Sequence, residues 1–271
     1  GTSVYMTQDL GTAQLRHDDF HPSKMIYVVG NEQNYHFEVL RHLAEKLGKP
    51  WAGAVYHLSY GMVELPQGRM KSREGTVVDA DDLMDEMTET ARRTTEALGK
   101  TDDFTEEEKK NLYHILGMGA LKYFILKVDP RKNMLFNPEE SIDFNGHTGP
   151  FIQYTHARIR SIVRAAGAER MATLSLDVDP GKISSRESGL LKTLYQFPET
   201  VQESASAVSP AIVAQYVYEL ARAFNQFYHD HSVLNEPERS LSDFRLQLSV
   251  MVANIIRSAM GLLGIEVPER M

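Results

Sequence analysis

Cysteine is absent from the 271 residues, and tryptophan occurs only once. Without cysteine the chain forms no disulfide and no thiolate metal site, a usage that fits an intracellular, cytoplasmic protein. No apolar run approaches the roughly 18 residues of a membrane-spanning helix, and no secretory pattern opens the sequence. Basic residues are outnumbered, with 29 Lys and Arg against 37 Asp and Glu and a formal net charge of −8. This balance argues against general coating of nucleic acid but leaves room for a local basic face.

Several motifs that carry enzyme chemistry are missing as well. The chain has no G-x-G-x-x-G or Walker-type phosphate loop, so nothing in it supports a generic nucleotide-binding α/β protein. Its 10 histidines show no H-x-x-x-H spacing with a carboxylate partner. We therefore predict no metal site and no tightly bound cofactor.

The first part of the chain has the pattern of a parallel α/β unit. Apolar runs at 25–29 and 54–60 are strand candidates, and a helical stripe at 35–47 lies between them. Ligands bind such sheets beyond the carboxyl ends of the strands. Residues 30–33 and 61–63, which follow the two strands, are therefore expected at one rim.

The rest of the chain is predicted to be helical. Asp79 is an N-cap candidate, and residues 105–108 form a capping box. Later helices are expected to begin near Pro150, Pro210 and Ser242. The expected organisation is a partial α/β domain at 1–78, a helical stem at 79–147 and an α-helical bundle domain at 148–271.

Polar side chains follow the predicted strands. A short β-prone run at Val4–Met6 places Tyr5 and Asp9 where a strand end is expected to turn into a helix. A carboxylate aided by a phenol can hold a guanidinium or ammonium group through charge-assisted hydrogen bonds. The alternative is that Asp9 simply caps the helix. Gln33 and His36 follow the next strand. Each is either a ligand contact or an ordinary polar group or helix cap.

A polar loop with three cations follows the strand at 54–60. Arg69, Lys71 and Arg73 lie beside Ser72 and Gly75. This composition suits a loop that stabilises phosphate charge with cations and backbone N–H groups. A solvated surface hairpin with ordinary charges is the alternative.

Two helical segments carry aromatic and cationic side chains together. Tyr154 and Arg158 lie in the helix after Pro150, and Tyr228 and His229 end the helix after Pro210. Exposed aromatics beside cations suit stacking on unpaired RNA bases and contact with phosphates. The alternative is an ordinary solvated face over core aromatics, and for Phe227 we favour the core.

Taken together, these segments resemble the arginyl-tRNA synthetases, a family of class I aminoacyl-tRNA synthetases. Residues 1–10, 27–37, 61–78, 140–162 and 262–271 carry the resemblance, in order and in register along essentially the whole chain. The fold that the resemblance implies is α/β plus all-α. It comprises the C-terminal part of a Rossmann-like catalytic domain, a helical stem and a DALR-type helical anticodon-binding domain.

The resemblance also implies roles for individual residues. The substrate arginine is expected at Tyr5, Asp9 and Gln33. ATP is expected at His36, Gly61, Met62, Val63 and Met70. The KMSKS-type loop implies catalytic roles for Arg69, Lys71, Ser72 and Arg73. Anticodon contacts are expected at Tyr154, Arg158, Tyr228, His229 and Met271.

The implied reaction is ATP-dependent activation of arginine, followed by transfer to tRNA(Arg), with Mg2+ accompanying ATP as substrate. By resemblance the full-length enzyme is a cytoplasmic monomer with no membrane partner. The loop departs from the usual pattern: Arg69 replaces the leading lysine, Lys71 stands where serine is usual, and Glu74 replaces a common lysine. The cations are present in permuted order.

The first class I signature, the HIGH-type ATP motif, has no match in the chain, which opens at Gly1 almost directly into a strand-like run. We therefore expect a C-terminal fragment that is inactive alone. The main alternative is a non-catalytic tRNA-binding module derived from a class I synthetase, although such a module has no need of Tyr5, Asp9 and Gln33. A cysteinyl-type synthetase would be expected to use cysteine zinc ligands, and none exist here.

Overall fold

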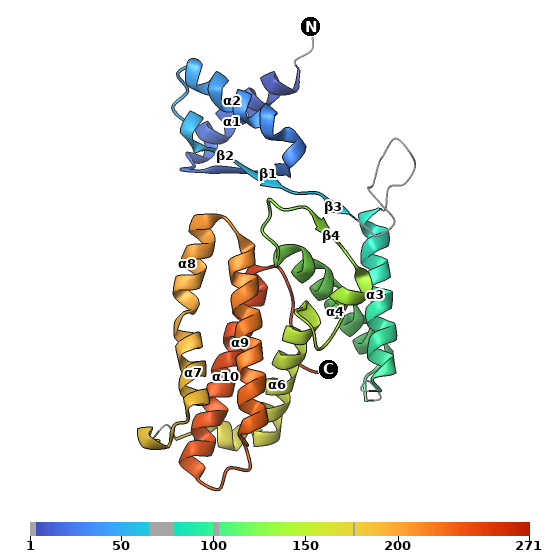
Figure 1. Ribbon diagram of the computed structural model, residues 1–271, viewed down its shortest axis with the longest axis vertical. Coiled ribbons are helices and arrows are strands. Elements are labelled where there is room, and N and C mark those ends of the chain that lie inside the picture. The colour runs from blue at the N-terminus through green and yellow to red at the C-terminus, as the bar shows by residue number, and fades with distance from the viewer. Residues whose placement is uncertain (1–3, 65–78, 100–102, 176) are drawn as a thin grey trace. The chain divides into compact units, whose positions relative to one another are not determined.

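The computed structural model describes residues 4–64, 79–99, 103–175 and 177–271. The chain divides into two compact units (Figure 1). Unit 1 comprises Gly1–Glu64 with Asp129–Leu135, and unit 2 comprises Leu65–Val128 with Phe136–Met271. The described residues form many helices and two small parallel sheets, which confirms the predicted fold class. The domain limits at 78 and 147 stay predictions.

Unit 1 is built around a parallel βαβ element, as predicted. Strands β1 and β2 pair in parallel from Met25↔Val55 to Gly30↔Tyr60, and strands β3 and β4 pair at Val63↔Met134. Its elements are α1 (Tyr5–Phe20), β1 (Met25–Gly30), the 3-10 turn η1 (Asn31–Gln33), α2 (Asn34–Lys46), the 3-10 turn η2 (Ala52–Ala54), β2 (Val55–Tyr60), β3 (Val63–Glu64) and β4 (Met134–Leu135).

The strand predicted at Val4–Met6 is wrong, because α1 begins at Tyr5. A three-residue run becomes a strand only when a neighbour completes its hydrogen-bond ladder, and among the described residues β1 pairs with β2 alone. Here the backbone closes a helical turn instead, with Gln8 N–H donating to the Val4 carbonyl at 3.1 Å. Since Val4 is the N-cap, the idea that Asp9 caps this helix is also wrong.

A small core holds α1 and α2 against the β1–β2 sheet. Trp51 is 1% exposed, and its indole Nε1–H donates to Gln14 Oε1 at 3.0 Å. Bonding the indole donor removes the cost of burying it. The apolar members of this core are Ala13, Met25, Ala44, Trp51 and Ala52.

Unit 2 consists almost entirely of helices. They are α3 (Ala80–Ala97), α4 (Glu106–Leu126), α5 (Pro138–Ser141), α6 (Gly149–Ala172), the 3-10 turn η3 (Pro180–Lys182), α7 (Ser185–Tyr195), α8 (Phe197–Ala207), α9 (Pro210–Asp230) and α10 (Arg239–Leu262). The predicted Asp79 cap and the Thr105–Glu108 capping box are both present. Helix α10 begins three residues before the predicted Ser242. In the described part of the chain, none of the helices is long and apolar enough to span a bilayer.

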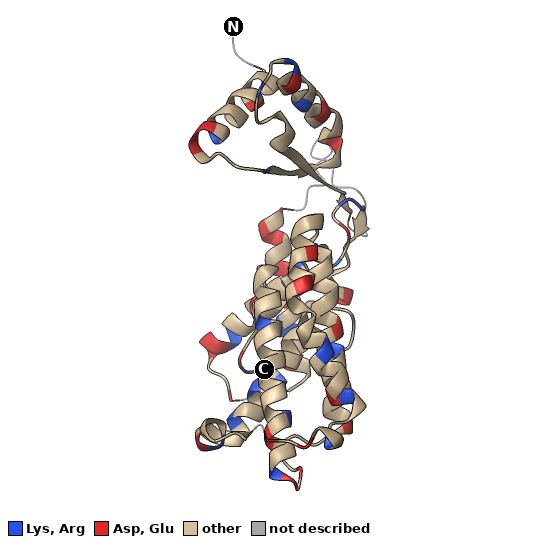
Figure 2. Cartoon of the chain, turned by 90° about the vertical axis from the view of Figure 1, so that its left-hand side faces the viewer, with Lys and Arg blue, Asp and Glu red and all other residues tan. Residues whose placement is uncertain are grey.

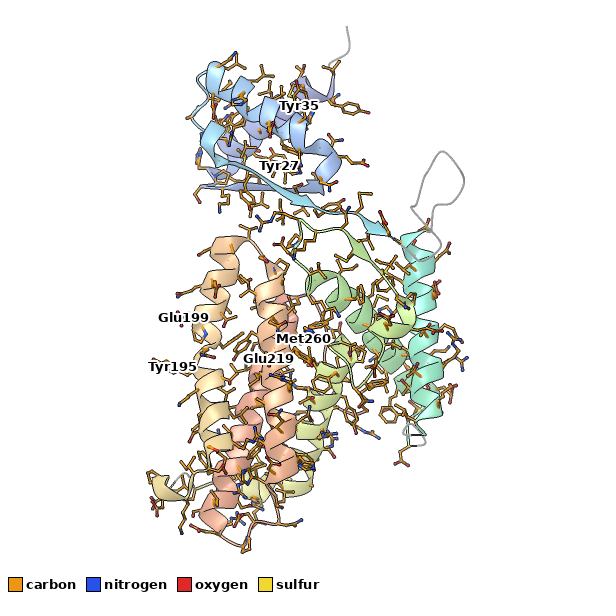
Figure 3. All side chains as sticks on the ribbon, in the orientation of Figure 1. Tyr27, Tyr35, Tyr195, Glu199, Glu219 and Met260 are labelled. Carbon is orange, nitrogen blue, oxygen red and sulfur yellow. The ribbon has the colours of Figure 1, made fainter. Side chains whose placement is uncertain are left out.

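Helix α9 lies against α6, α7, α8 and α10 (Figure 1). Phe224 and Phe227 are fully buried in this bundle, as expected for Phe227. Figure 3 shows Met260 among the helices, while Tyr195 and Glu199 point outward from α7 and α8. A large cluster of buried apolar side chains therefore sits in the bundle.

Glycines let α4 approach both α3 and α6 closely. A Cβ at Gly117 would lie 2.8 Å from the Met87 carbonyl of α3. A Cβ at Gly149, the first residue of α6, would lie 2.3 Å from the Gly119 carbonyl. Real Cβ atoms do not fit at such distances, so these helices touch backbone to backbone.

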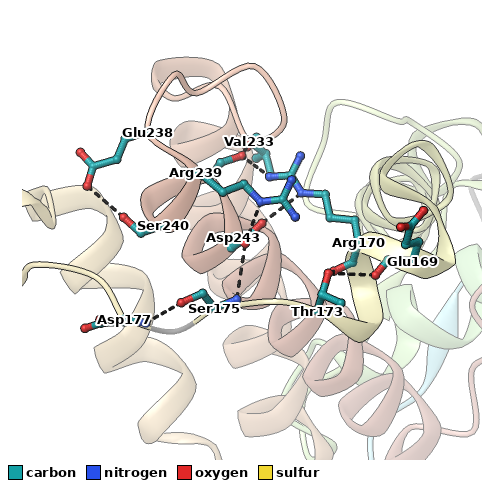
Figure 4. Close-up of polar contacts among 11 residues, drawn as sticks. Glu169, Arg170, Thr173, Ser175, Asp177, Val233, Glu238, Arg239, Ser240 and Asp243 are labelled. Carbon is teal, nitrogen blue, oxygen red and sulfur yellow. Dashed lines mark hydrogen bonds and ion pairs between the residues drawn. The ribbon is translucent and has the colours of Figure 1, made fainter.

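Buried charges fix the end of the bundle where α10 begins. Arg245 donates to the fully buried Glu187 at 2.7 Å and to Glu236 at 2.6 Å. Asp243, 1% exposed, accepts from Arg170 at 3.0 Å and Arg239 at 2.9 Å (Figure 4). Burial raises the pKa of Asp243, but the two arginines outweigh it and hold that pKa below its ordinary value. The carboxylate is therefore charged and fully partnered.

Candidate functional sites

The first candidate site lies in unit 1, where α1 and α2 each present one polar side chain. His36 Nε2 is 2.6 Å from Asp9 Oδ2, a contact between residues 27 apart in sequence. The side chains are 22% and 38% exposed, respectively. The His36 and Phe37 rings meet edge to face, and the Phe37 ring stacks on the His57 ring with 4.2 Å between the ring centroids. A partly accessible carboxylate with an oriented imidazole beside it results.

Tyr5 and Gln33 lie near this pair in sequence, one at the start of α1 and one just before α2. Tyr5 lies one turn before Asp9 on α1, with 82% of the residue exposed. Gln33 is the N-cap of α2, three residues before His36. The structure therefore brings the predicted arginine-pocket residue Asp9 together with the predicted ATP residue His36. The contacts of Tyr5 and Gln33 with substrate stay predictions.

Gly61–Val63, predicted to lie against ATP, run beside the segment 130–134. The Gly61 N–H donates to the Pro130 carbonyl at 2.7 Å, and the Met62 N–H donates to Asn133 Oδ1 at 2.8 Å. A Cβ at Gly61 would lie 2.3 Å from the Lys132 backbone, so the close approach requires glycine. The N–H groups of Gly61 and Met62 are thus committed, while the Met62 side chain remains 38% exposed. Contact of this segment with ATP stays a prediction.

The KMSKS-type loop falls outside the described residues. This applies to the predicted catalytic residues Arg69, Lys71, Ser72 and Arg73, and to the predicted ATP residue Met70. Among the residues that are described, no three His, Cys, Asp or Glu side chains gather to hold a metal ion.

The second candidate site lies in unit 2, where Arg158 of α6 joins two tyrosines. Its guanidinium carbon is 4.8 Å from the Tyr154 ring centroid and 5.5 Å from that of Tyr228. Nη1 of Arg158 also donates to Oδ1 of Asn225 on α9 at 2.5 Å. This bond fixes the orientation of the guanidinium against α9. A cation beside two aromatic rings is a surface for stacking on bases and binding phosphates.

Two cavities open beside Arg158, and both include Tyr154 and Met271 in their walls. One, of about 230 Å³, is lined by Thr95, Leu98, Phe144, Asn145, Tyr154, Arg158 and Met271. The other, of about 310 Å³, is lined by Asp103, Phe104, Tyr154, Ala157, Arg158, Ser161, Arg164, Arg270 and Met271. Three predicted anticodon residues, Tyr154, Arg158 and Met271, are therefore brought together, and Tyr228 joins them through Arg158.

The C-terminal tail that carries Met271 is tied to α6 by side chains. Buried His156 contacts the Pro268 carbonyl through Nδ1 at 3.0 Å. The Glu269 carboxylate accepts from Arg160 at 2.5 Å and from Arg257. Burial raises the pKa of Glu269, but the arginines outweigh it and hold that pKa below its ordinary value. These bonds position Met271 at the cavities.

His229 is set apart from this cluster. Its side chain is 88% exposed and pairs with Asp230 at 3.1 Å, and it lines neither cavity. Figure 2 shows acidic and basic side chains interspersed along the helices of this unit. Sequence reasoning missed Thr95, Phe104 and Phe144 as cavity residues, because nothing in the local pattern of their segments distinguishes them from ordinary helix and loop positions.

Two family models match the chain. Residues 1–137 match the model described as tRNA synthetases class I (R), catalytic domain. Residues 152–271 match the DALR anticodon binding domain. The first candidate site falls within the first match. In the second site, Thr95 and Phe104 belong to the first match and Tyr154 to the second, while Phe144 and Asn145 lie between the two.

Individual relatives agree with these models. The chain is 60% identical to an arginine–tRNA ligase of Phocaeicola vulgatus and 59% identical to one of Parabacteroides distasonis; each alignment covers 100% of this chain and 45% of the relative. The chain thus spans a little less than half the length of these curated relatives. The structure matches the Thermus thermophilus arginyl-tRNA synthetase with a TM-score of 0.86 at 26% identity, covering 100% of this chain and 50% of that one.

Proposed function

This chain belongs to the arginyl-tRNA synthetase family, and we propose on that premise that it serves the ATP-dependent attachment of arginine to tRNA(Arg). It contributes part of the arginine and ATP sites through unit 1 and the anticodon contacts through unit 2. The substrates are arginine, tRNA(Arg) and ATP accompanied by Mg2+. The full-length enzyme acts in the cytoplasm as a monomer.

Arginine recognition is assigned to Asp9, with Tyr5 and Gln33 beside it. A guanidinium is planar and always charged, so a carboxylate that accepts two parallel N–H groups selects it over the point charge of lysine. The short contact between Asp9 and His36 supports this role because it fixes the carboxylate in one orientation. Burying the substrate's donors against these acceptors gives discrimination, since an analogue that lacks them leaves acceptors unpaired.

Activation of arginine joins its carboxylate to the α-phosphate of ATP and releases pyrophosphate. Negative charge develops on the leaving pyrophosphate, and cations placed beside it lower the barrier. We assign that role to Arg69, Lys71 and Arg73, with Ser72 as a hydroxyl donor in the same loop. Gly61, Met62, Val63, Met70 and His36 are assigned to ATP.

Anticodon binding is assigned to the cluster around Arg158, and this cluster carries the proposal. Unpaired bases in RNA loops are recognised by stacking on aromatic and guanidinium planes. The Arg158 guanidinium lies within 5.5 Å of the Tyr154 and Tyr228 rings, so the three side chains offer such planes beside two cavities. Met271 lines both cavities. His229 follows Tyr228 near the end of α9.

Binding of an RNA hairpin that copies the anticodon arm of tRNA(Arg) tests the proposal. We expect the 271-residue chain to bind it more tightly than a hairpin with a scrambled loop. Tyr154→Ala combined with deletion of Met271 should abolish that difference, and Tyr195→Ala, an exposed tyrosine on α7, should leave it unchanged. Equal binding of both hairpins by the unaltered chain would refute the anticodon assignment.

A second measurement concerns the chemistry. No HIGH-type sequence occurs among the 271 residues, and we propose that this chain alone does not activate arginine. Arginine-dependent exchange of pyrophosphate into ATP by the pure chain should be at background. Exchange above the level of a Lys71→Ala, Arg73→Ala double variant would show that the proposal is wrong.

A further inference from the structure

Thr95 of α3 differs from the nearby Thr88 and Thr94 in the hydrogen bonding of its hydroxyl. The hydroxyls of Thr88 and Thr94 each donate to the carbonyl four residues earlier, at 2.9 Å. This bond is the usual way for a helix to satisfy a threonine. The Thr95 hydroxyl, in a residue only 3% exposed, has no hydrogen-bond partner among the described residues.

Thr95 lines the 230 Å³ cavity beside Tyr154 and Met271. The cavity has an aromatic wall, because the Phe144 and Tyr154 rings meet edge to face at 6.4 Å. Among the residues that line it, Thr95, Arg158 and the exposed Asn145 supply polar groups. Flat apolar walls with a few polar groups suit a flat heteroaromatic ligand that has hydrogen-bonding edges.

A buried hydroxyl without a partner destabilises the free protein, and a ligand that supplies the partner removes that penalty on binding. In an RNA loop, the group that offers both a flat face and a hydrogen-bonding edge is an unstacked base. We propose that this cavity receives one unpaired base of the bound RNA and that the Thr95 hydroxyl hydrogen-bonds the edge of that base. The inference rests on the proposed function of the Arg158 cluster.

Thr95 and Tyr154 line the same cavity but belong to different family domains. Residues 152–271 match the anticodon-binding family model, whereas Thr95 lies in the stretch that matches the catalytic-domain model. Helix α3 is held at its distance from α6 by the backbone contacts of α4 at Gly117 and Gly149. Base selection is therefore shared between two family domains, and Thr95 is a specificity-determining residue outside the anticodon-binding domain.

The test uses the 271-residue chain and anticodon-arm hairpins in which each loop base is replaced in turn by the other three. The unaltered chain should show a preference at one loop position. Thr95→Val, which keeps the shape and removes the hydroxyl, should weaken binding of the preferred hairpin about fivefold and flatten the preference at that position. Thr95→Ser should retain the preference. Thr94→Val, whose hydroxyl is bonded within the helix, should behave like the unaltered chain.

Thermal melting separates this role from a structural one. Because Thr95→Val removes a buried hydroxyl without a partner, its melting temperature should equal or exceed that of the unaltered chain. A lower melting temperature with an unchanged base preference would overturn the proposal and mark Thr95 as structural. If Thr95→Val binds the hairpins with the same affinity and the same base preference as the unaltered chain, this inference alone is overturned. No binding by the unaltered chain would overturn it together with the anticodon assignment.

Discussion

The guanidinium of Arg158 lies 4.8 Å from the ring centroid of Tyr154, one turn earlier on the same helix. The same guanidinium reaches the Tyr228 ring on α9 and bonds Asn225. A single planar cation therefore links the two helices that carry the predicted anticodon residues. Its planarity matters as much as its charge, because a guanidinium stacks on rings and bases whereas an ammonium does not.

Replacing Arg158 with lysine should separate planarity from charge. We expect Arg158→Lys to weaken binding of the anticodon-arm hairpin about tenfold, because the stacking and the Asn225 bond are lost while the charge is kept. Arg222→Lys, on the exposed face of α9 beside Glu219, is the matched control and should bind as before. Fluorescence anisotropy titration measures both. Equal affinities for the two variants would mean that Arg158 acts only as a charge.

Arginine should disturb the contact between Asp9 and His36. If Asp9 accepts the substrate guanidinium, arginine must share or displace the His36 bond, and the imidazole resonances of His36 should shift in NMR spectra. Lysine at the same concentration should cause a much smaller shift. Asp9→Asn should abolish the response to arginine, while Asp18→Asn, an exposed position on α1, should keep it. Identical responses to arginine and lysine would contradict the pocket assignment.

The Glu187–Arg245 pair should make the stability of unit 2 sensitive to acid. Burial raises the pKa of Glu187, but hydrogen bonds from Arg245 and Ser184 outweigh it and leave the pKa below its ordinary value. The folded chain thus binds the proton less tightly than the unfolded chain. The stabilisation is complete above the unfolded pKa of about 4.3 and is lost as pH falls through the folded pKa.

Glu187→Gln tests this linkage. At pH 7 it should lower the free energy of unfolding by about 3 kcal/mol, because Arg245 loses its buried partner and keeps only Glu236. Its difference from the unaltered chain should shrink below about pH 4, where Glu187 itself becomes protonated. Glu199→Gln, an exposed position on α8, should have no effect on stability. Urea unfolding at several pH values provides the measurement; a difference independent of pH would rule out the linkage.

Two glycine-to-alanine substitutions should have opposite effects. Gly117→Ala places a Cβ 2.8 Å from the α3 backbone and should destabilise unit 2 by about 1–3 kcal/mol. Gly189→Ala in α7 meets nothing within 4 Å and should stabilise by about 0.5–1 kcal/mol through reduced backbone freedom. Thermal melting of each variant decides the matter. Equal effects at both sites would show that the α3–α4 approach is not tight.

Much of the fold could be predicted from the sequence because its signals are local. The Asp79 cap, the 105–108 capping box and the prolines near the starts of α6 and α9 each act within one helical turn. The strand expected at Val4–Met6 failed because strand formation depends on a neighbour, which β-propensity within three residues does not supply.

The sequence identified several residues of the candidate sites but not the contacts between them. Asp9 and His36 could be named from their segments, but their 2.6 Å contact depends on how α1 packs on α2. Thr95 could not be singled out at all. Three other threonines lie in α3 within seven residues of it, and only the position of α6 and the tail decides which one meets the cavity.

Because α4 contacts its neighbours through backbone atoms, the width of the 230 Å³ cavity does not depend on which side chains fill the hydrophobic core. Side chains in the bundle can be exchanged over evolutionary time, and helices that rest on such side chains shift with each exchange. Helix α4 meets α3 and α6 through main-chain atoms at Gly117, Gly119 and Gly149, whose size no substitution elsewhere changes. Core side chains can therefore change in volume without altering the spacing between α3 and α6, on which the width of the 230 Å³ cavity depends.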